Sequence, residues 1–185
     1  MPVEAGAPPR TLTTTEAAVL ALLALEGERS GYDLLKLVSR AIGHVWAPAR
    51  SRLYAVLPRL VADGLASSRE VVQRGRPDKV LYRLEPAGRE VLEAWLAEVV
   101  PGDAAAIQLK VFVGGLVPRE TVVAQVEQYR RDAEARLAAL RRIDATNSRT
   151  GNDRFHGYLI DLGLAGAQTS IGWADAVLAD LRGRP

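Results

Sequence analysis

The sequence predicts a mainly α-helical fold with a small two-stranded β wing, continued by a region of long helices. Three observations predict it. Ala and Leu, both strong helix formers, are the commonest residues of the 185-residue chain. Apolar residues recur every three or four positions over most of its length, as on one face of a helix. Residues 65–84 instead show the alternation and turn residues of two strands.

The first helix begins at Thr13, because Thr13 and Glu16 have the spacing of a capping box, and Gly27 is expected to end it. A second helix begins at Ser30-Gly31. A third helix covers about residues 49–63, with Leu and Val on its inward face and Arg on its outward face. Pro58 lies inside this third helix, where it removes one backbone hydrogen bond and is expected to bend the axis.

Two strands and a fourth helix follow. The strands, 65–72 and 79–84, flank a polar turn that contains Gly75 and Pro77, and this pattern predicts a β-hairpin. Pro86 lies at a position typical of a first helical turn, so the fourth helix is expected to run from Pro86 to about residue 99.

The remainder of the chain is predicted to be helical. An apolar segment over 104–114 precedes a long helix that begins at Pro118, and a polar loop over 146–152 leads to a last helix over 153–182. Each long helix carries an apolar stripe whose spacing is close to that of a coiled coil, so the stripes are expected to have a partner. The stripes are positions 122, 126, 129, 133, 137, 140 and 143 of the first long helix, and Phe155, Leu159, Leu162, Gly166, Thr169, Trp173, Val177 and Leu181 of the second.

Three helices, a hairpin and a fourth helix make a winged helix-turn-helix, a fold whose third helix fits the major groove of double-stranded DNA. The Pro101-Gly102-Asp103 break separates this part from the long helices. We therefore expect a flexible N-terminal tail over 1–11, a winged helix-turn-helix DNA-binding domain over 12–100, and a helical dimerisation domain over 104–185.

Basic charge is concentrated on the predicted third helix and wing. Residues 50–83 hold eight basic and three acidic side chains, a net charge of +5, whereas the whole chain carries +2. A local excess of this kind is typical of a surface that meets phosphates. A charged outer helix face can also be merely solvated, and for Arg59 both interpretations stay open. The basic residues predicted to contact DNA are Arg50, Arg52, Arg59, Arg74, Arg76 and Lys79.

Composition argues against several other classes of protein. The chain has no Cys, which excludes disulfides, thiolate zinc sites and a cysteine nucleophile. Its two His, His44 and His156, lack partners at metal-ligand spacing, so we expect no metal. No phosphate loop or Ser/His/Asp pattern occurs, so we expect neither an enzyme nor a cofactor. No apolar run reaches about 18 residues and no signal-peptide pattern occurs, which favours a cytoplasmic protein without a membrane span.

Several stretches resemble the PadR family of bacterial transcriptional regulators. They are Leu22-Leu23-Ala24-Leu25, Gly31-Tyr32-Asp33-Leu34, Asp63-Gly64-Leu65, Gly75-Arg76-Pro77 and Lys79 to Leu84. Residues 104–185 resemble the long-helix extension of larger members named after virulence regulators. The resemblance implies a homodimeric repressor that binds an inverted-repeat operator, with Ser51 and Tyr54 contacting DNA and Arg76 in the wing. The chain departs from the family pattern at Ala55, where many members have Pro.

The resemblance also implies a small aromatic or phenolic effector, because some family members bind flat aromatic compounds through a Trp. The candidate effector-binding residues are Trp46, Trp95 and Trp173, and packing is the alternative role for each. The alternative function for the whole chain is a winged-helix protein–protein adaptor that does not bind DNA.

Overall fold

The computed structural model describes residues 11–41, 49–72, 78–100 and 104–183, so all but the last residue of the expected tail lies outside the described residues. The chain divides into two compact units. The first comprises Met1–Glu98 and Gln108–Val117, and the second comprises Val99–Ile107 and Pro118–Pro185.

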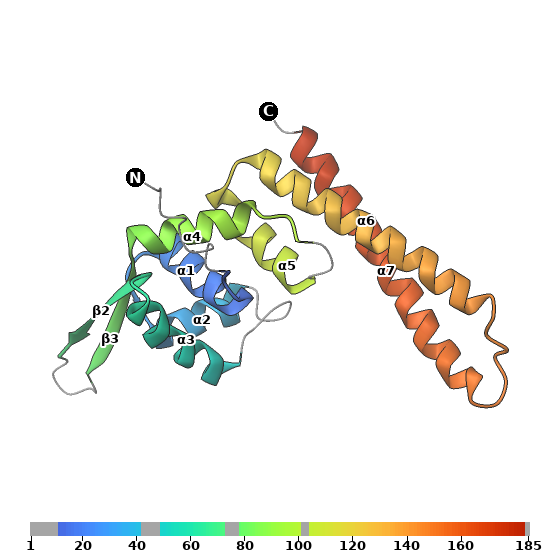
Figure 1. Ribbon diagram of the computed structural model, residues 1–185, viewed down its shortest axis with the longest axis horizontal. Helices are drawn as coiled ribbons and strands as arrows, with labels where there is room; N and C mark the ends of the chain where they lie inside the picture. Colours follow the sequence, from blue (N-terminus) through green and yellow to red (C-terminus); the bar gives the residue numbers. More distant parts are fainter. Residues whose placement is uncertain (1–10, 42–48, 73–77, 101–103, 184–185) are drawn as a thin grey trace, which may run out of the picture. The chain divides into compact units, whose positions relative to one another are not determined.

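Three helices form the centre of the first unit (Figure 1). Helix α1 (Thr14–Glu26) begins at the predicted capping box: the Thr13 hydroxyl accepts from the backbone N–H of Glu16 at 3.3 Å, and the Glu16 carboxylate accepts from the N–H of Thr13 at 2.9 Å. Helix α2 (Gly31–Ala41) and helix α3 (Arg50–Ala62) follow. Helix α1 is buried on almost every side, so the other elements pack around it.

The sheet has one strand more than the two predicted. Strands β2 (Ala66–Val71) and β3 (Lys79–Leu84) form the expected antiparallel hairpin, while β1 (Arg29–Ser30) pairs with the other edge of β3, in the order β1-β3-β2. The register pairs Arg29 with Tyr82 and Ser30 with Leu81. Strand β1 could not be predicted because its two residues are too few to show the alternation of a strand. It is defined by its pairing with β3, more than fifty positions away in the chain. The mainly helical fold class with a small β wing is confirmed.

Helix α4 (Pro86–Ala97) begins at the predicted proline and buries Leu92 and Leu96. Helix α5 (Ala104–Phe112) leads to a short 3-10 helix, η1 (Gly114–Leu116). The core of the first unit is almost entirely aliphatic, which is the basis of its stability. Its fully buried large side chains are Val19, Leu20, Leu34, Leu53, Leu57, Leu60, Leu92, Leu96, Leu109 and Val113.

The second unit is a hairpin of two long helices, α6 (Arg119–Asp144) and α7 (Asp153–Gly183), which lie side by side (Figure 1). Helix α6 buries part of its predicted stripe, namely Val122, Val126 and Ala133. Helix α7 buries a different set from its predicted stripe, namely Gly157, Ile160, Ala167, Ala174 and Leu178.

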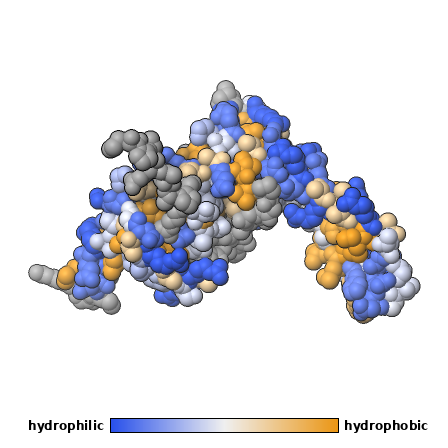
Figure 2. Space-filling model, viewed as in Figure 1, coloured by the Kyte–Doolittle hydropathy of each residue, from blue (hydrophilic) through white to orange (hydrophobic). Residues whose placement is uncertain are grey.

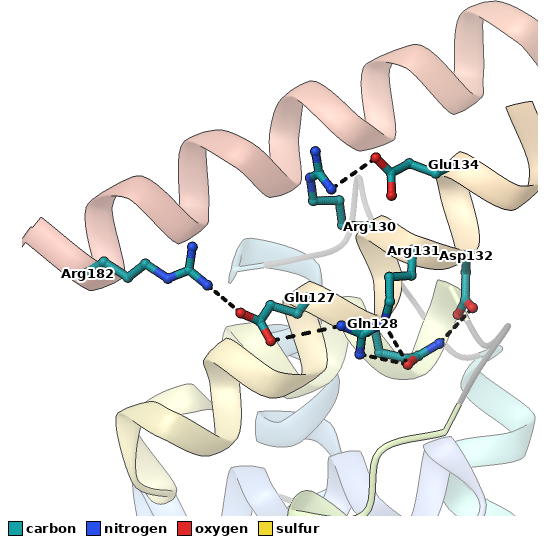
Figure 3. A network of polar contacts seen from close by, with 7 residues as sticks. All are labelled: Glu127, Gln128, Arg130, Arg131, Asp132, Glu134 and Arg182. Carbon is teal, nitrogen blue, oxygen red and sulfur yellow. Dashed lines mark hydrogen bonds and ion pairs between the residues drawn. The ribbon is translucent and has the colours of Figure 1, made fainter.

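A polar network joins the two helices near the C-terminal end of α7 (Figure 3). Arg182 of α7 donates to Glu127 of α6, and Arg131 donates to the side-chain oxygen of Gln128 at 2.8 Å. Arg130 pairs with Glu134 at 2.9 Å and with Asp175 of α7 at 2.6 Å. Such exposed pairs align the helices more than they stabilise them. Among the helices of the described residues, none is long and apolar enough to span a membrane.

Candidate nucleic-acid interface

Helix α3 separates an apolar inner face from a polar outer face. The buried residues of the inner face are Leu53, Val56, Leu57 and Leu60. The residues of α3 that were predicted to contact DNA are all exposed, namely Arg50, Ser51, Arg52, Tyr54 and Arg59. Ala49, at the N-cap, supplies no side-chain acceptor to the first turn. The N-terminal end of α3 therefore combines two guanidinium groups with a helix start that lacks a side-chain cap, a combination suited to an anion such as phosphate.

Tyr54 links this outer face to helix α2. Its ring lies so close to Gly31 that a Cβ there would be 2.8 Å from Tyr54 Cε1, so glycine is required for the approach of α2 and α3. The Arg50 guanidinium lies 5.8 Å from the centre of the same ring. Burial raises the pKa of the nearby Tyr82, and Tyr54 adds to the shift. Tyr54 is 40% exposed, so it both packs and remains open to a partner.

Arg59 has a partner inside the protein. Its Nη2 atom lies 3.6 Å from Oε1 of Glu16, the same carboxylate that caps α1. The Glu16 side chain is only 3% exposed, whereas that of Arg59 is 66% exposed. The guanidinium can therefore attach α3 to the start of α1 while part of it stays accessible.

Two other basic residues of the segment 50–83 pair with carboxylates of the first unit. Arg69 of β2 donates two hydrogen bonds to the Glu28 carboxylate and lowers its pKa. Arg83 pairs with Glu85 at 3.3 Å, and the pKa of that carboxyl is lowered mainly because the Ser67 hydroxyl donates to it.

The remaining basic residues of this segment are Arg50, Arg52, Arg74, Arg76 and Lys79. Among the described residues, Arg50 contacts the Tyr54 ring and Arg52 is exposed on the same face, while Lys79 at the start of β3 is near enough to Asp33 to help lower the pKa of that carboxyl. Arg74 and Arg76 lie outside the described residues. The charge that is open to an external partner thus gathers at the N-terminal end of α3 and at the base of the wing.

The candidate effector residues lie in different surroundings. Trp95 is 8% exposed, and the Lys110 ammonium lies 4.6 Å from its ring centre and donates to the backbone oxygen of Glu98. Lys110 itself is 3% exposed. This contact is not among the predictions from the sequence, although the lone lysine in the apolar segment 104–114 is a visible signal for it.

Trp173 is 37% exposed and meets the Tyr129 ring edge-on at 5.4 Å, while the Tyr129 hydroxyl is hydrogen bonded to Ser170 at 2.9 Å. Trp46 lies outside the described residues. Within the described ranges, no group of three or more His, Asp or Glu side chains is arranged to hold a metal ion.

Comparison with known proteins gives a match to each part of the chain. Residues 19–94 match the model of the transcriptional regulator PadR-like family, and residues 106–182 match that of the virulence activator alpha C-term. The probable transcriptional regulator Rv1176c of Mycobacterium tuberculosis is 28% identical over 174 residues, 85% of this chain and 92% of that protein. The negative transcriptional regulator PadR of Bacillus subtilis is 32% identical over 84 residues, 45% of this chain and 46% of that protein.

The chain is also similar to solved structures, at lower sequence identity. Bacillus subtilis PadR in complex with operator DNA has a TM-score of 0.47 and 23% identity, over 91% of this chain and 99% of that chain. The PadR-like transcriptional regulator BC1756 from Bacillus cereus has a TM-score of 0.42 and 21% identity, over 97% of this chain and 99% of that chain.

Proposed function

We propose that the chain is a homodimeric repressor of the PadR-like family of transcriptional regulators, with a virulence activator alpha C-terminal domain, and that it binds an inverted-repeat operator. One observation carries the proposal: the exposed face of α3 presents Arg50, Ser51, Arg52 and Tyr54 beside a basic wing. A helix with this face fits the major groove, which is about 12 Å wide.

Different side chains of α3 contact different groups of the DNA. Arg50 and Arg52, at the N-terminal end of the helix, contact phosphates or the acceptor edge of guanine, for which a guanidinium is suited. Ser51 and Tyr54 contact base edges or the sugar-phosphate backbone. Lys79, together with Arg74 and Arg76 of the preceding turn, contacts the backbone flanking the groove. Arg59 joins them through the part of its side chain that Glu16 leaves accessible.

Repression is the direction of regulation that we propose. The Bacillus subtilis relative is named a negative transcriptional regulator. A repressor needs only to occupy its operator, and the proposed interface supplies that binding without a further partner protein. Release by a small aromatic effector stays a prediction, and Trp173, whose ring is more exposed than that of Trp95, is the better candidate to meet one.

Dimerisation is supported by the face that α7 leaves uncovered. Phe155, Leu159 and Leu162 are 64%, 68% and 70% exposed, and they belong to the stripe predicted from the sequence. At 100° per residue this stripe lies about 140° around the helix from the face packed on α6. Figure 2 shows hydrophobic side chains gathered on the α6–α7 hairpin. A second copy is the occupant we propose, since two-fold pairing of identical chains is the commonest assembly and matches an inverted repeat.

Selection of bound sequences from random DNA, followed by fluorescence anisotropy, tests the DNA-binding proposal. We expect the selected sequence to be an inverted repeat. Replacing Arg50 and Arg52 together by Ala should weaken binding at least tenfold. It should also reduce the slope of the salt dependence by about one for each phosphate that the variant no longer neutralises.

The control for this experiment is the double variant Arg89→Ala with Arg136→Ala, which removes the same charge from exposed positions of α4 and α6. Equal effects of the two double variants would contradict the assignment of α3 as the reading helix. Failure to select any DNA would favour the adaptor alternative.

A further inference from the structure

A polar cavity of about 450 Å³ lies on the β1 side of the sheet, between the end of α1, the first turns of α2 and the start of β3. Lys36 of α2 and Lys79 of β3 both line it, together with Arg29 of β1. The chain has 21 Arg but only three Lys, and the third, Lys110, is buried beside Trp95. Both accessible lysines of an arginine-rich protein therefore converge on one cavity from positions 43 residues apart.

The carboxylates of this cavity already have partners. Glu28 accepts two hydrogen bonds from Arg69, and Glu26 pairs with Arg29 at 3.5 Å. Asp33 accepts from the Ser30 hydroxyl at 2.7 Å. Lys36 and Lys79 are not in ion-pair contact with these carboxylates, although the Lys79 ammonium is near enough to Asp33 to help lower the pKa of that carboxyl, which the Ser30 hydroxyl lowers most. Three basic and three acidic side chains line the cavity. Arg69, from outside the lining, neutralises Glu28, and Arg29 neutralises Glu26, so the two ammonium groups face one remaining carboxylate, that of Asp33.

We propose that this cavity takes a phosphate group between Lys36 and Lys79, and that in the DNA complex this is a backbone phosphate of the operator. The second clause rests on the function proposed above and adds α2 to the DNA-binding surface. The ammonium group of lysine is compact and binds phosphate as a point charge, so it does not require the planar, two-bond geometry of an arginine–phosphate pair. The two apolar lining residues, Leu37 and Leu81, offer no charged group that competes for the anion.

The position of the cavity between two elements of the proposed DNA interface supports the assignment of a DNA phosphate to it. On one side, α2 begins at Gly31, against which the Tyr54 ring of the reading helix packs. On the other side, Lys79 is the first residue of β3, directly after the basic turn of the wing. We therefore expect a duplex that contacts both elements to bring its backbone to this cavity.

The test compares Lys36→Gln, Lys79→Gln and the double variant with wild type by anisotropy on the selected duplex over a range of salt. The double variant should bind about tenfold more weakly at 0.1 M salt, and its salt slope should fall by about one, the value for one phosphate contact. The loss should be the same on unrelated duplex DNA, because a phosphate carries no sequence information. Replacing both lysines by Arg should restore most of the affinity, while Arg89→Gln is the control for removal of a surface charge.

A second measurement distinguishes the two sources of phosphate. Wild type and the double variant are titrated with inorganic phosphate at constant ionic strength in a calorimeter, without DNA. A lower salt slope with no saturable binding of phosphate supports a backbone phosphate. Saturable binding that the double variant loses supports a site for free phosphate, and it does so even if wild type selects no DNA and the proposed function fails. An unchanged slope together with no phosphate binding overturns the proposal.

Discussion

Gly88, in the first turns of α4, is a residue at which the backbone of the first unit leaves no room for a side chain. A Cβ at this position would lie 2.0 Å from the backbone oxygen of Leu65, which already accepts a hydrogen bond from Glu85 at 3.1 Å. Backbone cannot move aside as a flexible side chain can. Close approach of α4 to the chain just before β2 therefore depends on this one glycine.

Gly88→Ala is expected to destabilise the protein by about 2–3 kcal/mol, because it forces α4 away from Leu65. Gly172→Ala is the matched control, since Gly172 lies inside α7 with open space around it and away from both apolar faces. That substitution should stabilise by about 0.5–1 kcal/mol, because alanine restricts the unfolded chain. Urea unfolding followed by circular dichroism measures both, and changes of the same sign would contradict this account.

At the scale of elements, Arg149 closes the turn between the two long helices. Its guanidinium donates to Asp161 of α7 at 2.9 and 3.0 Å and also to Asp144 at the end of α6. Gly157 makes room for it, because a Cβ there would lie 2.8 Å from Arg149 Cδ. Arg149 has a φ of 57°, a left-handed conformation that favours glycine. The ion pairs therefore hold this residue in an unfavourable backbone conformation.

Arg149→Gln should lower the melting temperature, and Arg149→Gly should lower it less, because glycine relieves the backbone while both variants lose the ion pairs. Arg149 lowers the pKa of Asp161. The stabilisation is thus fully present above the unfolded-state pKa of about 3.9 and is lost as the pH falls through the lower folded-state value. Thermal melts at low and high salt and at several pH values test this. Equal melting of wild type and Arg149→Gln at neutral pH and low salt would refute the role of Arg149.

For the whole molecule, the apolar stripe on α7 makes a prediction about assembly. Leu159→Asp with Leu162→Asp places two charges on the uncovered face, so a dimer built on that face should dissociate. Light scattering should then give the 20.0 kDa of one chain in place of twice that mass. Affinity for the inverted repeat should fall as well, because a monomer cannot engage two half-sites at once.

The control for this prediction is Ala165→Asp with Gln168→Asp, which places the same charges on exposed positions of α7 outside the stripe. This variant should keep the mass of the wild type. A wild type that is monomeric at micromolar concentration, or a stripe variant that stays dimeric, would remove the second copy from the proposal.

Much of the fold could be predicted from the sequence because the signals are local. The Thr13–Glu16 capping box, the start of α4 at Pro86 and the break before α5 each depend on neighbours within a few positions. The exposed, basic face of α3 follows from helical periodicity and charge alone. Because these features require no knowledge of which elements meet, the sequence by itself determined the mainly helical class, the order of the helices and the β-hairpin, and the candidate DNA-reading helix.

The tertiary structure alone decided which distant residues meet. It paired β1 with β3, joined Arg59 to Glu16, and brought Lys36 to the same cavity as Lys79. It also decided which of the two apolar faces of α7 packs on α6 and which remains uncovered. Periodicity shows that one face of a helix is apolar, but it does not show which element covers that face. The covering element is decided by the packing of segments that lie far apart in the chain.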